Sequence, residues 1–416
     1  MKNFEHSLEQ AVADGVVLGA VVCAKGTEYL ATGLFILEAL DTDTFIGKVN
    51  YSNVFGNRTV TPKAEPMERD TVFVLASMTK LMTSIAVMQL VERGLVKLDD
   101  DIAPLLPALA KQPILTGFGE DGTPTTKERS GPITLHHLLT HSVGGTYDSA
   151  NSNILQWKKY HGLLGKPGVT VEEVFGHPLL YEPGESWCYG TASDWAGKVV
   201  EALSGLSLED YMKQNIWSPL GVKDITFWPA AHPGMANRMC SMAFRDTRSG
   251  KAAQSRKPIP MTPGAREAFG GQGAWASMVD YTEILNSLLV DDERLLKKET
   301  TAAMFQPQLS GGPKQALNES MANPQWAVGY YPPGEYNWGL GGLLFEGKTD
   351  SWRKPGTMLW GGAINSAWFI DRATGVCGAF GCNLLPVADP QIELLMKVFE
   401  EEIYKKASEE RRKTRL

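Results

Sequence analysis

The spacing of hydrophobic positions predicts strand-like segments at the two ends of the chain and helices between them. Short apolar runs with glycine or β-branched residues, bounded by turn residues, are typical of strands. Such runs occupy residues 19–24, 29–35, 358–370 and 376–382, with a turn predicted at residues 371–375. A short helix is predicted before the first of them, over residues 3–13.

From Ser77 onward, apolar side chains recur at the 3.6-residue period, which predicts one amphipathic helix. Its apolar face consists of Leu81, Ile85, Met88, Val91 and Leu95. The other predicted helices span residues 134–140, 192–203, 207–215 and 390–406. The charged tail after the last helix, residues 408–416, is expected to be frayed.

Strand-rich ends around a helical middle indicate that both termini build one sheet, into which the helical part is inserted. We therefore expect an α/β (α+β) fold, with an antiparallel sheet flanked by helices and a mostly helical inserted domain. The expected sheet domain is discontinuous and comprises residues 1–76 and 335–416. Residues 77–334 are expected to form the helical domain, which carries the candidate nucleophile.

Composition excludes several classes of function. The 416 residues are 43% hydrophobic and 21% charged, with a net charge of -7, so neither disorder nor nucleic-acid binding is expected. No apolar stretch is long enough for a membrane span, and the first residues carry no signal-peptide pattern, so we expect a cytoplasmic protein with reduced cysteines. The terminal Thr414-Arg415-Leu416 is a weak variant of the peroxisomal S-K-L signal, and a solvated tail is the preferred interpretation.

The main candidate for chemistry is the S-x-x-K tetrad Ser77-Met78-Thr79-Lys80. A second copy, Ser351-Trp352-Arg353-Lys354, shows that the pattern alone is weak evidence, and the proline and glycine after it disfavour a helix. Ser77 instead stands where a strand-like segment gives way to the long predicted helix. Positions i and i+3 share one helix face, so Lys80 is expected to reach the Ser77 hydroxyl.

This arrangement supplies what acyl transfer requires. A serine hydroxyl is a poor nucleophile until a neighbouring base takes its proton. A lysine amine serves as that base only where burial and nearby positive charge favour its neutral form, and the neighbours of Lys80 are apolar. The alternative is that Ser77 only caps the helix and Lys80 lies on the surface.

Two further segments favour the catalytic interpretation. Tyr189, within Trp187-Cys188-Tyr189-Gly190-Thr191, is a candidate proton shuttle that hydrogen-bonds Ser77 and Lys80. The strand-like run Leu359-Trp360-Gly361-Gly362-Ala363 has small residues that let its backbone approach a substrate. One N–H group from this run and that of Ser77 would form an oxyanion hole.

Together these segments resemble the serine β-lactamase and penicillin-binding-protein superfamily, specifically its class C-like esterase and transesterase branch. The likeness extends particularly to fungal acyltransferases of the lovastatin side-chain-transferring type. It runs along most of the chain in one order, through residues 75–81, 92–96, 133–141, 183–185, 189–190, 194–198, 219–221 and 269–273.

The resemblance implies a β-lactamase-like fold, an acylated Ser77, and proton transfer by Lys80 and Tyr189. It also implies backbone oxyanion donors at Ser77 and Ala363. Three positions depart from the family pattern: Thr191 stands in the third place of Tyr-x-Asn, Trp360-Gly361-Gly362 replaces Lys-Thr-Gly, and His141-Ser142-Val143-Gly144 differs slightly from the usual His-Thr-Ser-Gly. Without the strand lysine the usual carboxylate anchor is missing, so hydrolysis of antibiotics or cell-wall peptides is not expected.

Our hypothesis is therefore a serine acyltransferase that moves an acyl group from a thioester or ester to a hydroxyl of a hydrophobic small molecule, with a polyketide-like natural product as the candidate acceptor. The donor is a small molecule, with an acyl carrier domain or acyl-CoA as candidate carriers. An esterase with the same machinery is the alternative, and a catalytically silent binding homologue is a third. No cofactor or metal is expected; the pair His137 and His141 has metal-ligand spacing but no third ligand.

Tryptophans recur near the segments expected to border the cleft. Core packing must account for most of them, but the functional alternative is a broad apolar cleft for a bulky acceptor or a long acyl chain. The candidate cleft residues are Trp187, Trp275, Trp326, Trp338, Trp360, Gly361 and Gly362.

Overall fold

A computed structural model of the chain describes residues 2–27, 49–166, 168–255, 262, 264–347 and 352–414. Its largest sheet is antiparallel throughout and combines strands from both ends of the chain, as expected. In spatial order the strands are β11 (Tyr336–Trp338), β12 (Leu343–Phe345), β13 (Thr357–Gly362), β14 (Ser366–Asp371), β15 (Val376–Gly381), β1 (Gly19–Gly26), β2 (Asn50–Thr59) and β3 (Glu65–Pro66). The division into two domains at residues 76 and 334 stays a prediction.

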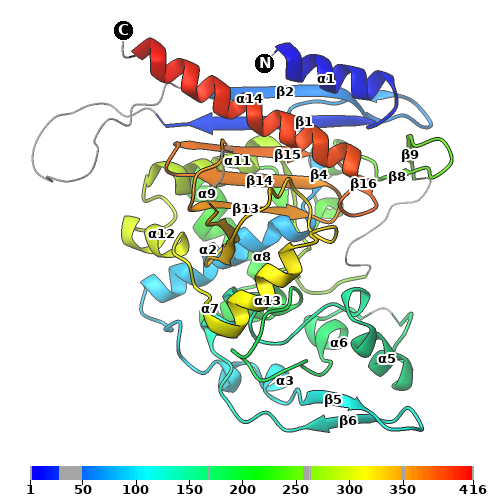
Figure 1. Cartoon of the computed structure of the whole chain (residues 1–416), viewed down its shortest axis with the longest axis vertical. Coiled ribbons are helices and arrows are strands. Elements are labelled where there is room, and N and C mark those ends of the chain that lie inside the picture. The colour runs from blue at the N-terminus through cyan, green and yellow to red at the C-terminus, as the bar shows by residue number, and fades with distance from the viewer. Residues whose placement is uncertain are drawn as a thin grey trace, which may run out of the picture.

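Helices cover both faces of this sheet. The terminal helices α1 (Lys2–Ala13) and α14 (Pro390–Thr414) pack together on one face, and the ring centroids of Phe4 and Phe399 lie 5.5 Å apart. Figure 1 shows α14 crossing the strands, with the two ends of the chain near one another. Helix α11 (Met278–Val290) packs against β1, β14 and β15. Since α11 lies within residues 77–334, the part of the chain expected to form the helical domain also helps to build the sheet layer.

Helix α2 (Thr79–Glu92) lies at the centre of the molecule (Figure 1). Every residue from Thr79 to Leu90 is buried, because α7 (Ala192–Ser204) and α8 (Leu208–Met212) pack on it together with the rest of the core. The prediction of an amphipathic helix with one apolar face was therefore wrong. Leu95 follows the end of the helix and its side chain is 54% exposed.

Small sheets and short helices complete the fold. The small sheets are β4 (Val72–Val74) with β10 (Trp275–Ser277) and β7 (Ile225–Thr226); β16 (Leu384–Leu385) with β8 (Ala243–Arg245) and β9 (Ala252–Gln254); and β5 (Ile114–Phe118) with β6 (Pro124–Lys127). The remaining helices are η1 (Ala76–Met78), η2 (Ala103–Leu105), α3 (Pro107–Ala110), α4 (Leu135–Leu139), η3 (Asp148–Ala150), α5 (Ser152–Tyr160), α6 (Val171–Phe175), η4 (Lys213–Trp217), α9 (Ser218–Leu220), η5 (Pro229–Ala231), α10 (Pro233–Ala236), α12 (Lys298–Met304) and α13 (Gly311–Met321).

Most predicted elements are confirmed, with three differences. The run 358–370 forms two strands, β13 and β14, because Asn365 adopts a left-handed conformation (φ 59°) and its N–H bonds Gly362 O, which closes a hairpin. The segment expected to fray continues α14 as helix to Thr414. The strand expected at residues 29–35 lies outside the described residues.

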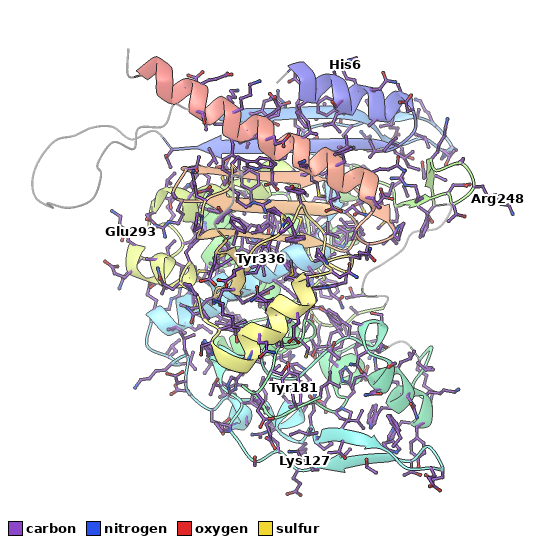
Figure 2. All side chains as sticks on the ribbon, viewed as in Figure 1. His6, Lys127, Tyr181, Arg248, Glu293 and Tyr336 are labelled. Atoms are coloured by element: carbon purple, nitrogen blue, oxygen red, sulfur yellow. The ribbon has the colours of Figure 1, made fainter. Side chains whose placement is uncertain are left out.

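Side chains fill the space between the sheet and the helical part, as Figure 2 shows. Tyr336, labelled there beside α13, is 1% exposed. No helix in the described part of the chain combines the length and the hydropathy that a membrane span requires.

Candidate active site

Ser77 lies in a sharp turn between a strand and the central helix. Strand β4 leads into η1, and α2 begins two residues after Ser77. The preceding residue, Ala76, has φ 45°, a left-handed conformation that a residue with a Cβ adopts only under strain and that is frequent at functional sites. Ala76 and Met78 are buried whereas Ser77 is partly exposed, so the turn presents the hydroxyl at the start of α2.

The amine of Lys80 contacts Ser77 directly, as the i, i+3 spacing predicted. Lys80 is 3% exposed, and its Nζ donates hydrogen bonds to Ser77 Oγ (3.1 Å), Tyr147 OH (3.0 Å) and the carbonyl of Gly271 (2.7 Å). An ammonium group has three hydrogens, and each has an acceptor here. The alternative of a surface lysine is therefore wrong. The second S-x-x-K copy begins at Ser351, outside the described residues.

Tyr147 is a member of this cluster that the sequence did not reveal. Its ring packs between Phe175 and Tyr189, with centroid distances of 5.7 and 6.0 Å. Burial, with smaller contributions from Asp194 and Tyr189, raises its pKa well above the ordinary value, so the phenol stays protonated. Tyr147 follows a Gly-Gly pair, in a loop whose position depends on the tertiary fold and not on any local motif.

Tyr189 lies beside Lys80, but with its ring and not with its hydroxyl. The Nζ of Lys80 is 4.7 Å from the ring centroid, within the range of a cation–π contact. The Tyr189 hydroxyl accepts a hydrogen bond from Trp360 Nε1 (2.9 Å). The expected hydrogen bond between Lys80 and a tyrosine hydroxyl is thus made by Tyr147, which accepts it, because the loop before η3 places Tyr147 next to the amine. The catalytic role of Tyr189 stays a prediction.

The end of strand β13 closely approaches residues 75–77, the turn that carries the candidate nucleophile Ser77 and is called the nucleophile turn below. A Cβ on Gly362, the last residue of β13, would lie 2.3 Å from Leu75 O and 3.3 Å from the Cβ of Ala76. Only glycine permits this approach, which brings Ala363 beside the residues that precede Ser77. Ala363 and Trp275 pack on a small cluster that includes Val74 and Ala76, and Ala363, like Ser77, is partly exposed. The oxyanion role of the Ser77 and Ala363 N–H groups stays a prediction.

Tryptophans from three parts of the chain surround Tyr189. Trp187, Trp338 and Trp360 are buried, and Trp326 is partly exposed; the centroids of Trp326 and Trp360 lie 5.5 and 4.9 Å from that of Tyr189. The rings of Trp187, Tyr189, Trp326, Trp338 and Trp360 form one packed cluster, called the aromatic wall below, and of its tryptophans only Trp326 has substantial contact with solvent. Trp275 stands apart from it on β10, paired with Val74. Whether these residues bind substrate stays a prediction.

The histidines have structural surroundings. His137 and Thr134 form a capping box at the start of α4, and His136 Nε2 lies 3.3 Å from Gln308 Oε1. His141 packs on Tyr189 with a centroid distance of 4.9 Å. Burial, assisted by the charge of Lys80, lowers the pKa of His141 well below its ordinary value, so the ring is neutral. No group of three or more His, Cys, Asp or Glu side chains with a metal-binding arrangement occurs within the described ranges.

An open groove of about 810 Å³ lies beside α13, and neither Ser77, Lys80, Tyr147 nor Tyr189 lines it. Helix α13 contributes Lys314 and Asn318 to its lining, and the following segment contributes Tyr331. The ring centroid of Tyr331 is 6.4 Å from that of Trp360, which in turn contacts Tyr189. A drug-sized molecule fits a volume of this order.

Comparison with known proteins agrees with the geometry. The family model described as Beta-lactamase matches residues 4–400. The chain is 36% identical over 412 residues to a lovastatin esterase of Penicillium rubens, covering 97% of this chain and 98% of the relative. It is 35% identical over 403 residues to monacolin J acid methylbutanoyltransferase of Aspergillus terreus, covering 95% and 97%. The structure of an Aspergillus terreus simvastatin synthase variant superimposes with a TM-score of 0.86 at 35% identity, covering 98% of this chain and 95% of that one.

Proposed function

We propose that this chain, which belongs to the beta-lactamase family, is a serine acyltransferase that works through an acyl-Ser77 intermediate. The observation that carries the proposal is the 3.1 Å contact between Lys80 Nζ and Ser77 Oγ at the start of a buried helix. A base within hydrogen-bond reach of a serine hydroxyl is the geometric requirement for nucleophilic catalysis. In the family this pair performs acylation, and the relatives named above are acyl-transferring or ester-cleaving enzymes by their names.

In the first half-reaction, Ser77 Oγ attacks the carbonyl carbon of the donor while its proton passes to Lys80 in its neutral form. The carbonyl oxygen becomes an oxyanion, which the backbone N–H groups of Ser77 and Ala363 stabilise. The carbon–sulfur or carbon–oxygen bond of the donor then breaks. The leaving thiol or alcohol takes up the proton, so the products are acyl-Ser77 and the free thiol or alcohol.

In the second half-reaction, an acceptor hydroxyl attacks the carbonyl carbon of acyl-Ser77, and Lys80 takes the proton of that hydroxyl. The Ser77 ester bond breaks, Oγ regains the proton, and the acyl group leaves as a new ester. Tyr147 and Tyr189 are the two phenols beside Lys80 that are available to relay this proton. The hydroxyl of Tyr189, which accepts from Trp360, keeps its own hydrogen free to donate.

The acceptor we propose is a hydroxyl on a hydrophobic small molecule of polyketide type. The aromatic wall supports a bulky apolar partner. By their names, one relative transfers a methylbutanoyl group to monacolin J acid and another is an esterase of lovastatin. Delivery of the acyl group by acyl-CoA or a carrier domain, and action in the cytoplasm, belong to the same proposal. Esterase activity with the same residues is the second candidate, because the identities to the two relatives, 36% and 35%, are nearly equal.

Intact-mass measurement separates these functions. The protein is incubated with a panel of acyl thioesters and esters, with and without an alcohol acceptor, and the acyl adduct is followed over time. We expect an adduct on Ser77 that decays faster with the alcohol than with water alone, and that is absent in Ser77→Ala. Decay at one rate with or without acceptor indicates the esterase. No adduct with any donor, or full turnover by Ser77→Ala, would contradict both functions.

A further inference from the structure

Asp194 is a buried carboxylate that the steps above do not use. It lies in the first turn of α7 and is 0% exposed. One carboxylate oxygen, Oδ1, accepts a hydrogen bond from the N–H of Gly271 (2.9 Å), whereas Oδ2 has no hydrogen-bond partner within the described part of the chain. A carboxylate buried with one oxygen unpaired costs folding free energy, and an asparagine would accept the same bond without a charge. This cost indicates that the charge of Asp194 has a function.

Gly271 joins Asp194 to the lysine. Its N–H donates to Asp194 while its carbonyl accepts the shortest hydrogen bond of Lys80, at 2.7 Å. The carboxylate lies directly against this residue, since a Cβ on Gly271 would be 2.4 Å from Asp194 Oδ2. Asp194 therefore holds the N–H of Gly271, while the carbonyl of Gly271 holds the amine of Lys80.

The charges at this point are complementary. Lys80 is buried, and its three hydrogen bonds go to a hydroxyl, a phenol and a carbonyl, none of which carries a formal negative charge. The carboxylate of Asp194 accepts from the N–H of the same residue whose carbonyl accepts from Lys80, and, against the rise caused by burial, the charge of Lys80 lowers the pKa of that carboxyl.

We propose that Asp194 is a positioning residue of the active site: its ionised carboxylate holds Gly271, and the carbonyl of Gly271 aligns Lys80 on Ser77. This inference rests on the proposed function and adds a residue to it. Protonation of Asp194 would weaken the acceptor of the Gly271 N–H, because a neutral carboxylic acid accepts a hydrogen bond less strongly than a carboxylate. Acylation of Ser77 should therefore slow when Asp194 is protonated.

The direction of the pH effect follows from the groups around the pair. Burial raises the pKa of Asp194 to about 6, although the charge of Lys80 opposes this rise, so the carboxylate is ionised above that pH. The other titratable side chains that face the pair are Tyr147, Tyr189 and His141. Burial keeps Tyr147 and His141 uncharged, so neither supplies this pH dependence. As the pH falls through about 6, Asp194 becomes neutral, its hold on Gly271 weakens and acylation should slow.

The test is the pH dependence of kcat/KM for Ser77 acylation by a small activated ester, with product measured by chromatography. In Asp194→Asn, the acid limb is expected to move to lower pH by about one unit, since the carboxylate whose protonation near pH 6 loosens Gly271 is gone. Thr83→Val is the matched control. Thr83 Oγ1 donates to the carbonyl of Gly270 (2.7 Å), so this variant releases the same loop without changing any charge. We expect it to lower the rate at all pH values and leave the limb in place.

An acid limb at the parent pH in Asp194→Asn would overturn the inference, and so would an equal shift in Thr83→Val. If Asp194→Asn does not fold, Asp194→Ala removes the same charge without adding unpaired amide hydrogens, and the same shift is expected from it. The parent protein separates this inference from the proposed function. If the parent forms no acyl-Ser77, the function is wrong; if it does and the limb is unmoved, only the assignment of Asp194 is wrong.

Discussion

The close approach of Gly362 to the nucleophile turn provides the sharpest test of the oxyanion hole. In Gly362→Ala the new Cβ would lie 2.3 Å from Leu75 O, about 1 Å inside ordinary van der Waals contact. Because φ of Gly362 is not positive, alanine suits its backbone, and the effect comes from this contact alone. Strand β13 and the turn before Ser77 must separate, which widens the gap between the Ser77 and Ala363 N–H groups.

The expected loss in acylation rate is about 10²-fold, the order reported for a misplacement of 1 Å or for one lost oxyanion donor. The overpacking should also lower the free energy of unfolding by about 1–3 kcal/mol. Single-turnover acylation by an activated ester measures the first quantity, and urea unfolding measures the second.

Gly361→Ala is the control for this prediction. Its Cβ would meet Val328 O, also at 2.3 Å, but successive strand residues point to opposite faces, so it pushes away from the nucleophile turn. We expect a similar loss of stability with a clearly smaller loss of acylation. Acylation at the parent rate in Gly362→Ala, or equal losses in the two variants, would refute the oxyanion assignment.

Three further predictions concern single side chains. Tyr147→Phe removes one acceptor of Lys80 and should slow acylation by about 10- to 100-fold, from the 1.5–3 kcal/mol of a charged hydrogen bond; an unchanged single-turnover rate would exclude Tyr147 from the mechanism. Trp360→Phe keeps the ring packing but removes the donor to Tyr189, so acylation should fall by up to about tenfold, whereas parent kinetics would mean that this bond does not orient Tyr189. Burial lowers the pKa of His177 from 6.5 to about 4, so between these values the unfolded chain binds a proton that the folded protein does not. The free energy of unfolding should therefore fall by about 3 kcal/mol as the pH drops through this window, and urea unfolding of His177→Leu should lack that slope; the same slope in both proteins would refute it.

The contact between Ser77 and Lys80 could be predicted from the sequence because its geometry is local. Ser77 and Lys80 are three residues apart at a helix start, so one turn of backbone sets their contact. The sheet built from both termini was also predictable, because short apolar runs typical of strands occupy both ends of the chain. The burial of α2 on all sides was not, because it depends on which helices pack around it and not on its own pattern.

Tyr147 and Asp194 could not be identified for the same physical reason. Their contacts with Lys80 and Gly271 join residues separated by 67 and 77 positions, and no local spacing encodes such distances. A tyrosine beside Gly-Gly and an aspartate in the first turn of a helix both have ordinary local explanations, namely a loop aromatic and a favourable helix-dipole charge. Only the tertiary fold, which brings the loop before η3, α7 and residues 269–273 to one point, distinguishes them.

Transfer and hydrolysis are hard to separate within this fold because both would use the same contacts of Lys80. The three acceptors of Lys80 come from the nucleophile turn, a loop and the Gly271 segment, and this buried set serves any acyl-Ser77 regardless of what attacks it. We expect the choice between an alcohol and water to depend on how fully the partly exposed side of Ser77 is closed when the acceptor is bound. Trp326 is the member of the aromatic wall with substantial contact with solvent, and it packs on both Tyr189 and Trp360. Differences between esterases and transferases with this machinery should therefore be sought around Trp326, and not among Ser77, Lys80 and their direct partners.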